Sequence, residues 1–112
     1  MFEVKERQTG PVTVLELSGR LTMGGGSQTL EESLQKQIAG GRRSLLLDCS
    51  QVSNIDSQGI KALVRGLTSL QRQGGKLKLL KVTPRVREVL NLMRLLTVIE
   101  AFEDEPTALR SF

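Results

Sequence analysis

The chain has 112 residues and a formal net charge of +4, with no histidine, no tryptophan and one cysteine. These counts exclude imidazole catalysis, histidine-ligated metal sites and an intrachain disulfide. With 38% apolar and 25% charged residues, the chain is expected to form one soluble domain over 1–112. The charged N-terminus is unlike a signal peptide, and no run approaches the ~20 apolar residues of a membrane span. A cytoplasmic protein is therefore expected.

The first half of the chain predicts a β-hairpin, a helix and a buried strand. Its elements are a strand at 2–7, a strand at 12–17, a loop at 19–26, a helix from Ser27 or Thr29, and a strand at 44–49. The last strand is apolar on both faces, which is typical of a central strand covered by helices. Cys49, near its end, is expected to be buried and inert.

The second half predicts two further strand–helix units and a short terminal helix. Its elements are a loop at 50–55, a helix from Asp56 or Ser57, a strand at 76–81, a helix from Pro84, a strand at 98–102 and a helix at 106–110. In the helix from Pro84, four residues are expected to point inward: Val86, Val89, Leu90 and Met93. Three leucines exceed this stripe and are assigned to the core or, alternatively, to an apolar patch: Leu92, Leu95 and Leu96.

Repeated strand–helix–strand units predict an α/β fold with a mixed, mostly parallel β-sheet packed by helices. The N-terminal hairpin adds an antiparallel pair to this sheet. In open α/β sheets, ligands and regulatory events gather beyond the carboxyl ends of the strands. The junction between the central strand and the second helix, at Asp56-Ser57, is therefore the candidate site.

A serine at this junction lies close to unpaired backbone N–H groups and to the positive end of the helix. A phosphate there would add about 1.5 to 2 negative charges and would meet donors that favour anions. The simpler alternative is that Asp56 and Ser57 only cap the helix, which stabilises it by ~1 kcal/mol. Spacing alone does not choose between these two roles, and they are compatible.

The strings Leu45-Leu46-Leu47-Asp48-Cys49-Ser50 and Asn54-Ile55-Asp56-Ser57-Gln58-Gly59-Ile60 resemble the STAS domain of bacterial anti-sigma factor antagonists. In that family an apolar strand ends in Asp and leads, after a short loop, to Asp-Ser-Ser/Thr-Gly. The segment Leu17-Ser18-Gly19-Arg20-Leu21 resembles the family's segment after the second strand. The resemblance covers nearly the whole chain.

The resemblance implies a non-enzymatic protein whose unphosphorylated form binds an anti-sigma factor that is also a serine kinase, which releases the sigma factor. Ser57 would be the phosphoacceptor, and a phosphatase would restore the unphosphorylated form. Asp56 would cap the helix or orient the hydroxyl, and Gly59 would allow close backbone approach. The partner-binding residues would be Asp56, Ser57, Gln58, Gly59, Thr22 and Asn54.

The chain departs from the family pattern at two positions. Thr22 stands where the family commonly has Asp, and Gln58 replaces a second hydroxyl residue, which leaves Ser57 as the only hydroxyl of the motif. Asp48 is expected either to bind loop amides or to contact a partner. Thr22 and the unusual run Gly24-Gly25-Gly26 keep open a second hypothesis, a STAS scaffold or accessory subunit of another assembly, such as a lipid transporter, without a phosphoswitch.

Enzymatic activity is not expected, because Ser57 has no histidine to activate it and no phosphate-binding loop is present. No cofactor or metal is expected. Nucleic-acid binding is disfavoured because the basic residues are scattered and aromatic residues make up only 3% of the chain. A monomer is expected in the free state.

Overall fold

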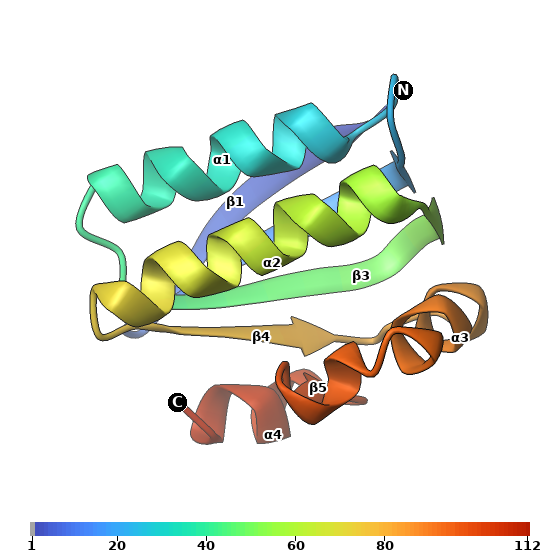
Figure 1. The fold of residues 1–112 in the computed structure, drawn as a ribbon. Helices are drawn as coiled ribbons and strands as arrows, with labels where there is room; N and C mark the ends of the chain where they lie inside the picture. The colour runs from blue at the N-terminus through green and yellow to red at the C-terminus, as the bar shows by residue number, and fades with distance from the viewer. Residues whose placement is uncertain (1) are drawn as a thin grey trace.

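The computed structural model describes residues 2–112 and has one mixed β-sheet with the strand order β1-β2-β3-β4-β5 (Figure 1). The strands are β1 (Glu3–Thr9), β2 (Val12–Leu21), β3 (Ser44–Ile55), β4 (Lys76–Leu80) and β5 (Ala101–Phe102). The helices are α1 (Ser27–Ala39), α2 (Ser57–Arg72), α3 (Pro84–Leu92) and α4 (Glu105–Arg110), with a 3₁₀ turn η1 (Leu95–Thr97). β1 and β2 pair antiparallel and the other neighbours pair parallel, which confirms the predicted fold class.

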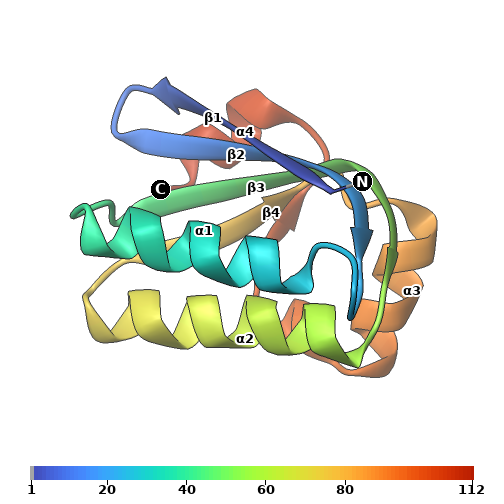
Figure 2. The ribbon, with the colours of Figure 1, turned by 90° about the horizontal axis from the view of Figure 1, so that it is seen from above.

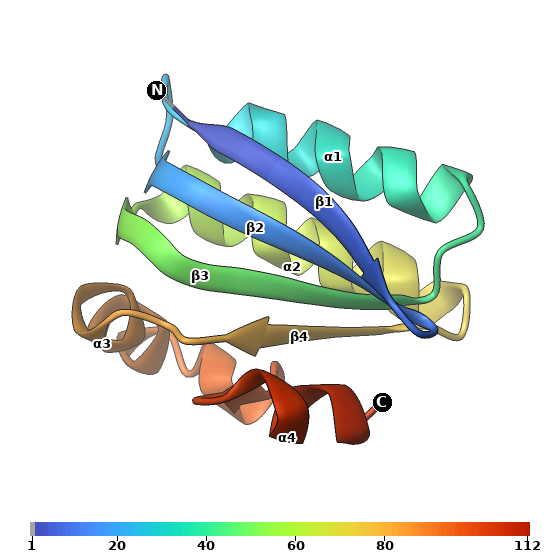
Figure 3. The same ribbon diagram turned by 180° about the vertical axis from the view of Figure 1, so that it is seen from behind.

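The helices lie on both faces of the sheet and at one end of it. α1 and α2 run side by side along one face, α4 lies on the opposite face, and α3 sits at the end where β3 turns into α2 (Figures 2 and 3). β3 contributes to the core on both faces: Leu45 and Leu47 pack with the α1/α2 side, and Leu46 packs under α4. All three leucines are fully buried, as expected for a central strand.

β2 and β3 extend beyond their predicted ends, and β3 ends next to the candidate site at Asp56-Ser57. Their parallel pairing continues to Leu21 and Ile55, through segments that the sequence predicted to be loops. Twice along this pairing β3 carries one residue more than β2, once after Asp48 and once after Val52. Such bulges break the alternation of apolar and polar residues, which hides the strand from pattern analysis.

The end of α3 differs from the prediction. Met93 is 57% exposed and Leu92 is 77% exposed, so both point outward, whereas Leu95 and Leu96 pack against the core. Arg94 adopts the left-handed conformation (φ 57°), which ends α3 and redirects the chain before η1. The inward assignment of Met93 and the core assignment of Leu92 were therefore wrong, and the last strand is shorter than predicted.

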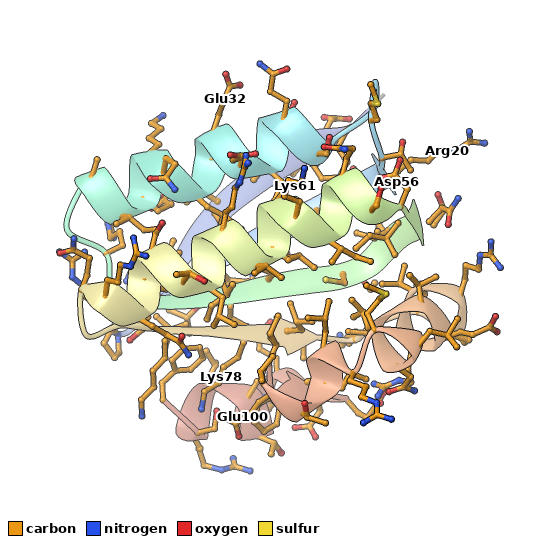
Figure 4. The ribbon with its side chains drawn as sticks, in the orientation of Figure 1. Arg20, Glu32, Asp56, Lys61, Lys78 and Glu100 are labelled. Carbon is orange, nitrogen blue, oxygen red and sulfur yellow. The ribbon has the colours of Figure 1, made fainter. Side chains whose placement is uncertain are left out.

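Lys78 on β4 is only 5% exposed, under α4. Its Nζ donates to the carbonyl oxygen of Ser111 at 2.8 Å and to the Ser111 hydroxyl at 2.9 Å, and it pairs with Glu100 at 3.1 Å. Figure 4 shows Lys78 and Glu100 close together. The Phe112 ring lies 4.9 Å from the ammonium. A buried charge with this many partners fixes the position of the C-terminal helix on the sheet.

Candidate functional site

Asp56 is the N-cap of α2. Its backbone is extended (φ −120°, ψ −171°), and its Oδ1 accepts hydrogen bonds from the amides of Gln58 at 2.9 Å and Gly59 at 3.1 Å. These are two of the donors that a helix start leaves without an intrahelical partner. The predicted capping role of Asp56 is therefore present in the structure.

Asp56 also ties α2 to the loop between β2 and α1. Its Oδ2 accepts from the Met23 amide at 3.0 Å, and its own amide donates to the carbonyl oxygen of Leu21 at 3.2 Å. The bond from Met23, followed by those from Gly59 and Gln58, lowers the pKa of Asp56 below its ordinary value. One carboxylate thus fixes two segments that are more than thirty residues apart in sequence.

Gly59 lies where the first turn of α2 meets the end of β2. A Cβ at this position would stand 2.1 Å from the Leu21 carbonyl oxygen, which is backbone and cannot move aside as a side chain can. The predicted close backbone approach at Gly59 is confirmed, and only glycine fits this contact. Gln58, beside it, is half-buried and lines a hollow shared with the β2–α1 loop.

Ser57 is the first residue of α2 and is exposed. The sequence predicted free N–H groups around its hydroxyl, but the amides of Gln58 and Gly59 are already bonded to Asp56. A phosphate on Ser57 would therefore stand next to a carboxylate rather than on these two donors. Its main effect would be on the surface charge around Ser57.

An apolar groove of about 530 Å³ begins at Ser57 and runs between α2 and α3. Its apolar lining is Ile60, Val64, Val89, Leu92 and Met93, and its polar lining is Asp56, Ser57, Lys61 and Arg65. Sequence analysis assigned Met93 to the interior and left Leu92 open between the core and an apolar patch, and the patch alternative is present for Leu92. The signal available was the excess of apolar residues over the inward stripe of the third helix.

The two remaining predicted site residues lie near the Asp56 junction but bond locally. The Thr22 carbonyl oxygen accepts from the amides of Gly25 at 2.9 Å and Ser27 at 3.3 Å, which shapes the turn into α1. Asn54 pairs in register with Arg20, and its Oδ1 accepts from the Ile55 amide at 2.9 Å. In Figure 4, Arg20 and Asp56 lie at the same end of the molecule. Both Thr22 and Asn54 are half-buried.

Asp48 and Cys49 lie further back along β3. Asp48 accepts a hydrogen bond from the Ser50 amide at 3.0 Å, at the first bulge, so it makes the predicted kind of bond to a backbone amide. Cys49 is buried, as expected, and burial is the main reason its thiol pKa rises to about 12. Within residues 2–112, no cluster of three potential metal ligands occurs. Over the same residues, no helix combines the length and apolar character needed to cross a bilayer.

The chain is similar to one curated protein, BtrV of Bordetella bronchiseptica, which is provisionally named an anti-sigma factor antagonist. The two sequences are 27% identical over 86 residues, which is 77% of this chain and 74% of BtrV. This similarity is below the level that transfers a function. It agrees with the resemblance seen in the motif around Ser57.

Three solved structures illustrate the likeness of the fold. An anti-sigma factor antagonist from Mycobacterium paratuberculosis has a TM-score of 0.88 at 22% identity, over 99% of this chain and 93% of that one. The Bacillus cell fate determinant SpoIIAA in its phosphorylated form has a TM-score of 0.73 at 19% identity, over all of both chains. A sulfate transporter family protein from Wolinella succinogenes has a TM-score of 0.79 at 23% identity, over 94% and 87%.

At these identities the structural likeness establishes the fold and leaves the partner open. The family follows from the sequence itself. The STAS domain model matches residues 3–108, from the start of β1 into α4. The protein therefore belongs to the STAS domain family.

Proposed function

We propose that this STAS domain is an anti-sigma factor antagonist whose binding is switched by phosphorylation of Ser57. In this proposal the unphosphorylated form binds an anti-sigma factor that is also a serine kinase and so releases a sigma factor. Phosphorylation at Ser57 ends the complex, and a phosphatase restores it. The similarity to BtrV and the phosphorylated state of the structurally similar SpoIIAA support this assignment.

The observation that carries the proposal is that Ser57 is exposed in the first turn of α2, whereas its neighbours Asp56 and Gly59 are held by other contacts. Asp56 is held by three backbone amides, and Gly59 is packed against the Leu21 carbonyl. Ser57 and Gln58 are therefore the residues of the motif whose side chains remain available to a partner. Asp56 and Gly59 position them, and Thr22 and Asn54, near the same junction, complete the proposed partner-binding set.

Phosphorylation would act through charge rather than through refolding. It adds about 1.5 to 2 negative charges beside the Asp56 carboxylate, at a helix start that already has its capping bonds. The helix then keeps its position, while the potential at the mouth of the groove changes sign. A partner that fits the unmodified surface is repelled by the modified one.

In this proposal the protein acts as a non-enzymatic binding module in the cytoplasm, without a cofactor, and it is a monomer when free. Its partners are the kinase and the phosphatase, and nucleic acid is not among them.

The first experiment is to purify the protein from its native cells and to measure its intact mass. Ser57→Ala is compared with Ser53→Ala, since Ser53 is also exposed but lies on β3. A species with one phosphate in the wild type and in Ser53→Ala, and none in Ser57→Ala, is expected. In a pull-down with the kinase, Ser57→Ala should bind and Ser57→Asp should not; equal binding of the two variants contradicts the proposal.

A second candidate function is a scaffold or accessory subunit of a transport assembly without a phosphoswitch. The fold likeness to the sulfate transporter family protein of Wolinella succinogenes is the observation in its favour. Copurification with a membrane-transport ATPase, together with an unmodified Ser57 under every growth condition, is the result that selects this function.

A further inference from the structure

The groove between α2 and α3 exposes several large apolar side chains to solvent. Within residues 2–112, five large apolar residues are exposed, and three of them line this groove: Val64 at 37%, Leu92 at 77% and Met93 at 57%. Ile60 and Val89 form its floor and pack against the core. Contiguous exposed apolar surface of this kind marks a site of protein association.

The groove lining carries two cations and one carboxylate. Lys61 and Arg65 line it, and Lys61 forms no salt bridge within the described part of the chain, while Arg65 pairs with Glu31 at 2.9 Å. Figure 4 shows Lys61 on α2, near the end of the helix that begins at Asp56. The one acidic residue of the lining, Asp56, stays charged at the Ser57 end of the groove, with its carboxylate oxygens accepting from three backbone amides.

We infer that this groove receives an amphipathic helix with acidic residues along the edges of its apolar stripe. The inference rests on the proposed function for the identity of the partner, the anti-sigma factor, and it adds which part of that partner binds here. The lined stretch of α2, from Ser57 to Arg65, spans about 12 Å, or about two helical turns. A bound helix would therefore use apolar anchors at positions i, i+3, i+4 and i+7.

A second copy of this chain fits the groove poorly. Two-fold pairing through this surface would place two copies of both cations, Lys61 and Arg65, in one interface. Like charges held together at an interface disfavour association. Acidic flanks on the bound helix would instead meet these two cations, which supplies the specificity that the apolar contacts lack.

The same arrangement explains how Ser57 controls the groove. Ser57 and Lys61 are four residues apart on α2, so they share one face, and both line the groove. A phosphate on Ser57 would offset the Lys61 charge and would place negative charge at the end of the groove. An acidic helix would then be repelled, whereas a neutral apolar helix would be affected little.

The test uses two synthetic peptides that form amphipathic helices with the same leucine stripe, one flanked by glutamates and one by lysines. Each is titrated into the ¹⁵N-labelled full chain. The glutamate peptide should shift the amide signals of Val64, Leu92 and Met93, and it should bind at least about tenfold more tightly than the lysine peptide. Equal affinity of the two peptides, or shifts outside the groove, overturns the inference.

Matched variants separate the groove from general surface effects. Lys61→Glu should weaken the glutamate peptide about tenfold, and Lys36→Glu, on the exposed side of α1, should not. Leu92→Ser should do the same, and Val98→Ser should not, because Val98 is 59% exposed but lies outside the groove. All four sites are exposed, so unfolding temperatures should stay close to the wild type. Equal losses at test and control sites contradict the inference.

The two proposals fail in different ways. If the glutamate peptide binds the groove while Ser57 is never phosphorylated in native cells, the docking surface stands and the phosphoswitch fails. If Ser57 is phosphorylated and controls kinase binding, but the glutamate peptide does not bind, the phosphoswitch stands and the docking surface fails.

Discussion

Replacing Asp56 with alanine should destabilise the protein and loosen the β2–α1 loop at the same time. The change removes two capping bonds, from Gln58 and Gly59, and the bond from Met23. Loss of an N-cap costs typically ~1 kcal/mol. A hydrogen bond to a charged group is worth about 1.5 kcal/mol or more when buried, and less for the solvent-exposed Met23 contact. The free energy of unfolding should fall by about 2 kcal/mol.

Two further variants separate the helix-capping part of this loss in unfolding free energy from the part due to the Met23 contact. Asp56→Asn keeps an oxygen for the cap but turns an NH₂ group toward the Met23 amide, so it should cost about 1 kcal/mol. Asp104→Ala removes a cap from α4, where Asp104 accepts from Thr107 at 2.9 Å without holding a second loop. It should cost less than Asp56→Ala does.

The assay is urea unfolding at equilibrium, analysed by linear extrapolation. With a slope of about 1 to 3 kcal/mol per molar urea, a loss of 2 kcal/mol moves the midpoint by about 1 M. The pKa of Asp56 is lowered in the folded state, so its contribution is present above the unfolded value of about 4. The difference between wild type and Asp56→Ala should therefore shrink as the pH falls below about 4 and through the lower folded pKa. A difference that is unchanged between pH 7 and pH 2, or a cost below about 0.5 kcal/mol, would refute the reasoning.

Three other predictions concern side chains away from the Asp56 carboxylate. Gly59→Ala should cost at least ~3 kcal/mol in urea unfolding, because its Cβ meets the Leu21 carbonyl oxygen, whereas Gly66→Ala should cost clearly less, since its Cβ meets only the movable end of a leucine side chain. Lys78→Met should lower the free energy of unfolding by about 1 to 2 kcal/mol and speed hydrogen exchange in α4, because it removes the bonds that hold the C-terminus; unchanged exchange in α4 contradicts this role. Cys49 should resist alkylation by iodoacetamide at pH 8 in the native protein and react fully in urea, because its buried thiol has a pKa of about 12; rapid native labelling contradicts the burial.

Sequence patterns predicted the parts of the fold that depend on local periodicity. The start of α2 at Asp56-Ser57 and the burial of Leu45, Leu46 and Leu47 follow from a capping signal and from a short apolar run, and both are present in the structure. These features need only the spacing of neighbouring residues. They are therefore readable without knowledge of the rest of the chain.

The features that sequence analysis missed depend on particular side-chain contacts and on a turn that the apolar pattern does not encode. Lys78 alternates with leucines as a solvent-facing residue would, yet it is buried because Ser111, 33 residues later, folds over it. The amides near Ser57 were expected to be free, but the Asp56 carboxylate occupies them. The exposed Leu92 and Met93 lie next to the left-handed turn at Arg94, which no local pattern predicted.

The two bulges in β3 have a consequence for how the length of this strand is constrained in evolution. Side chains of a strand alternate between faces, so removal of one residue turns every later side chain to the opposite face until the strand ends. A single deletion in the regular stretch from Leu45 to Leu47 would shift the pairing by one residue and turn the side chains on one side of the deletion to the opposite face of the sheet. A deletion at either bulge would remove the extra residue and leave Val52 opposite Gly19 and Ile55 opposite Leu21. Deletions in the regular stretch of β3 should therefore be tolerated less readily than deletions at its two bulges.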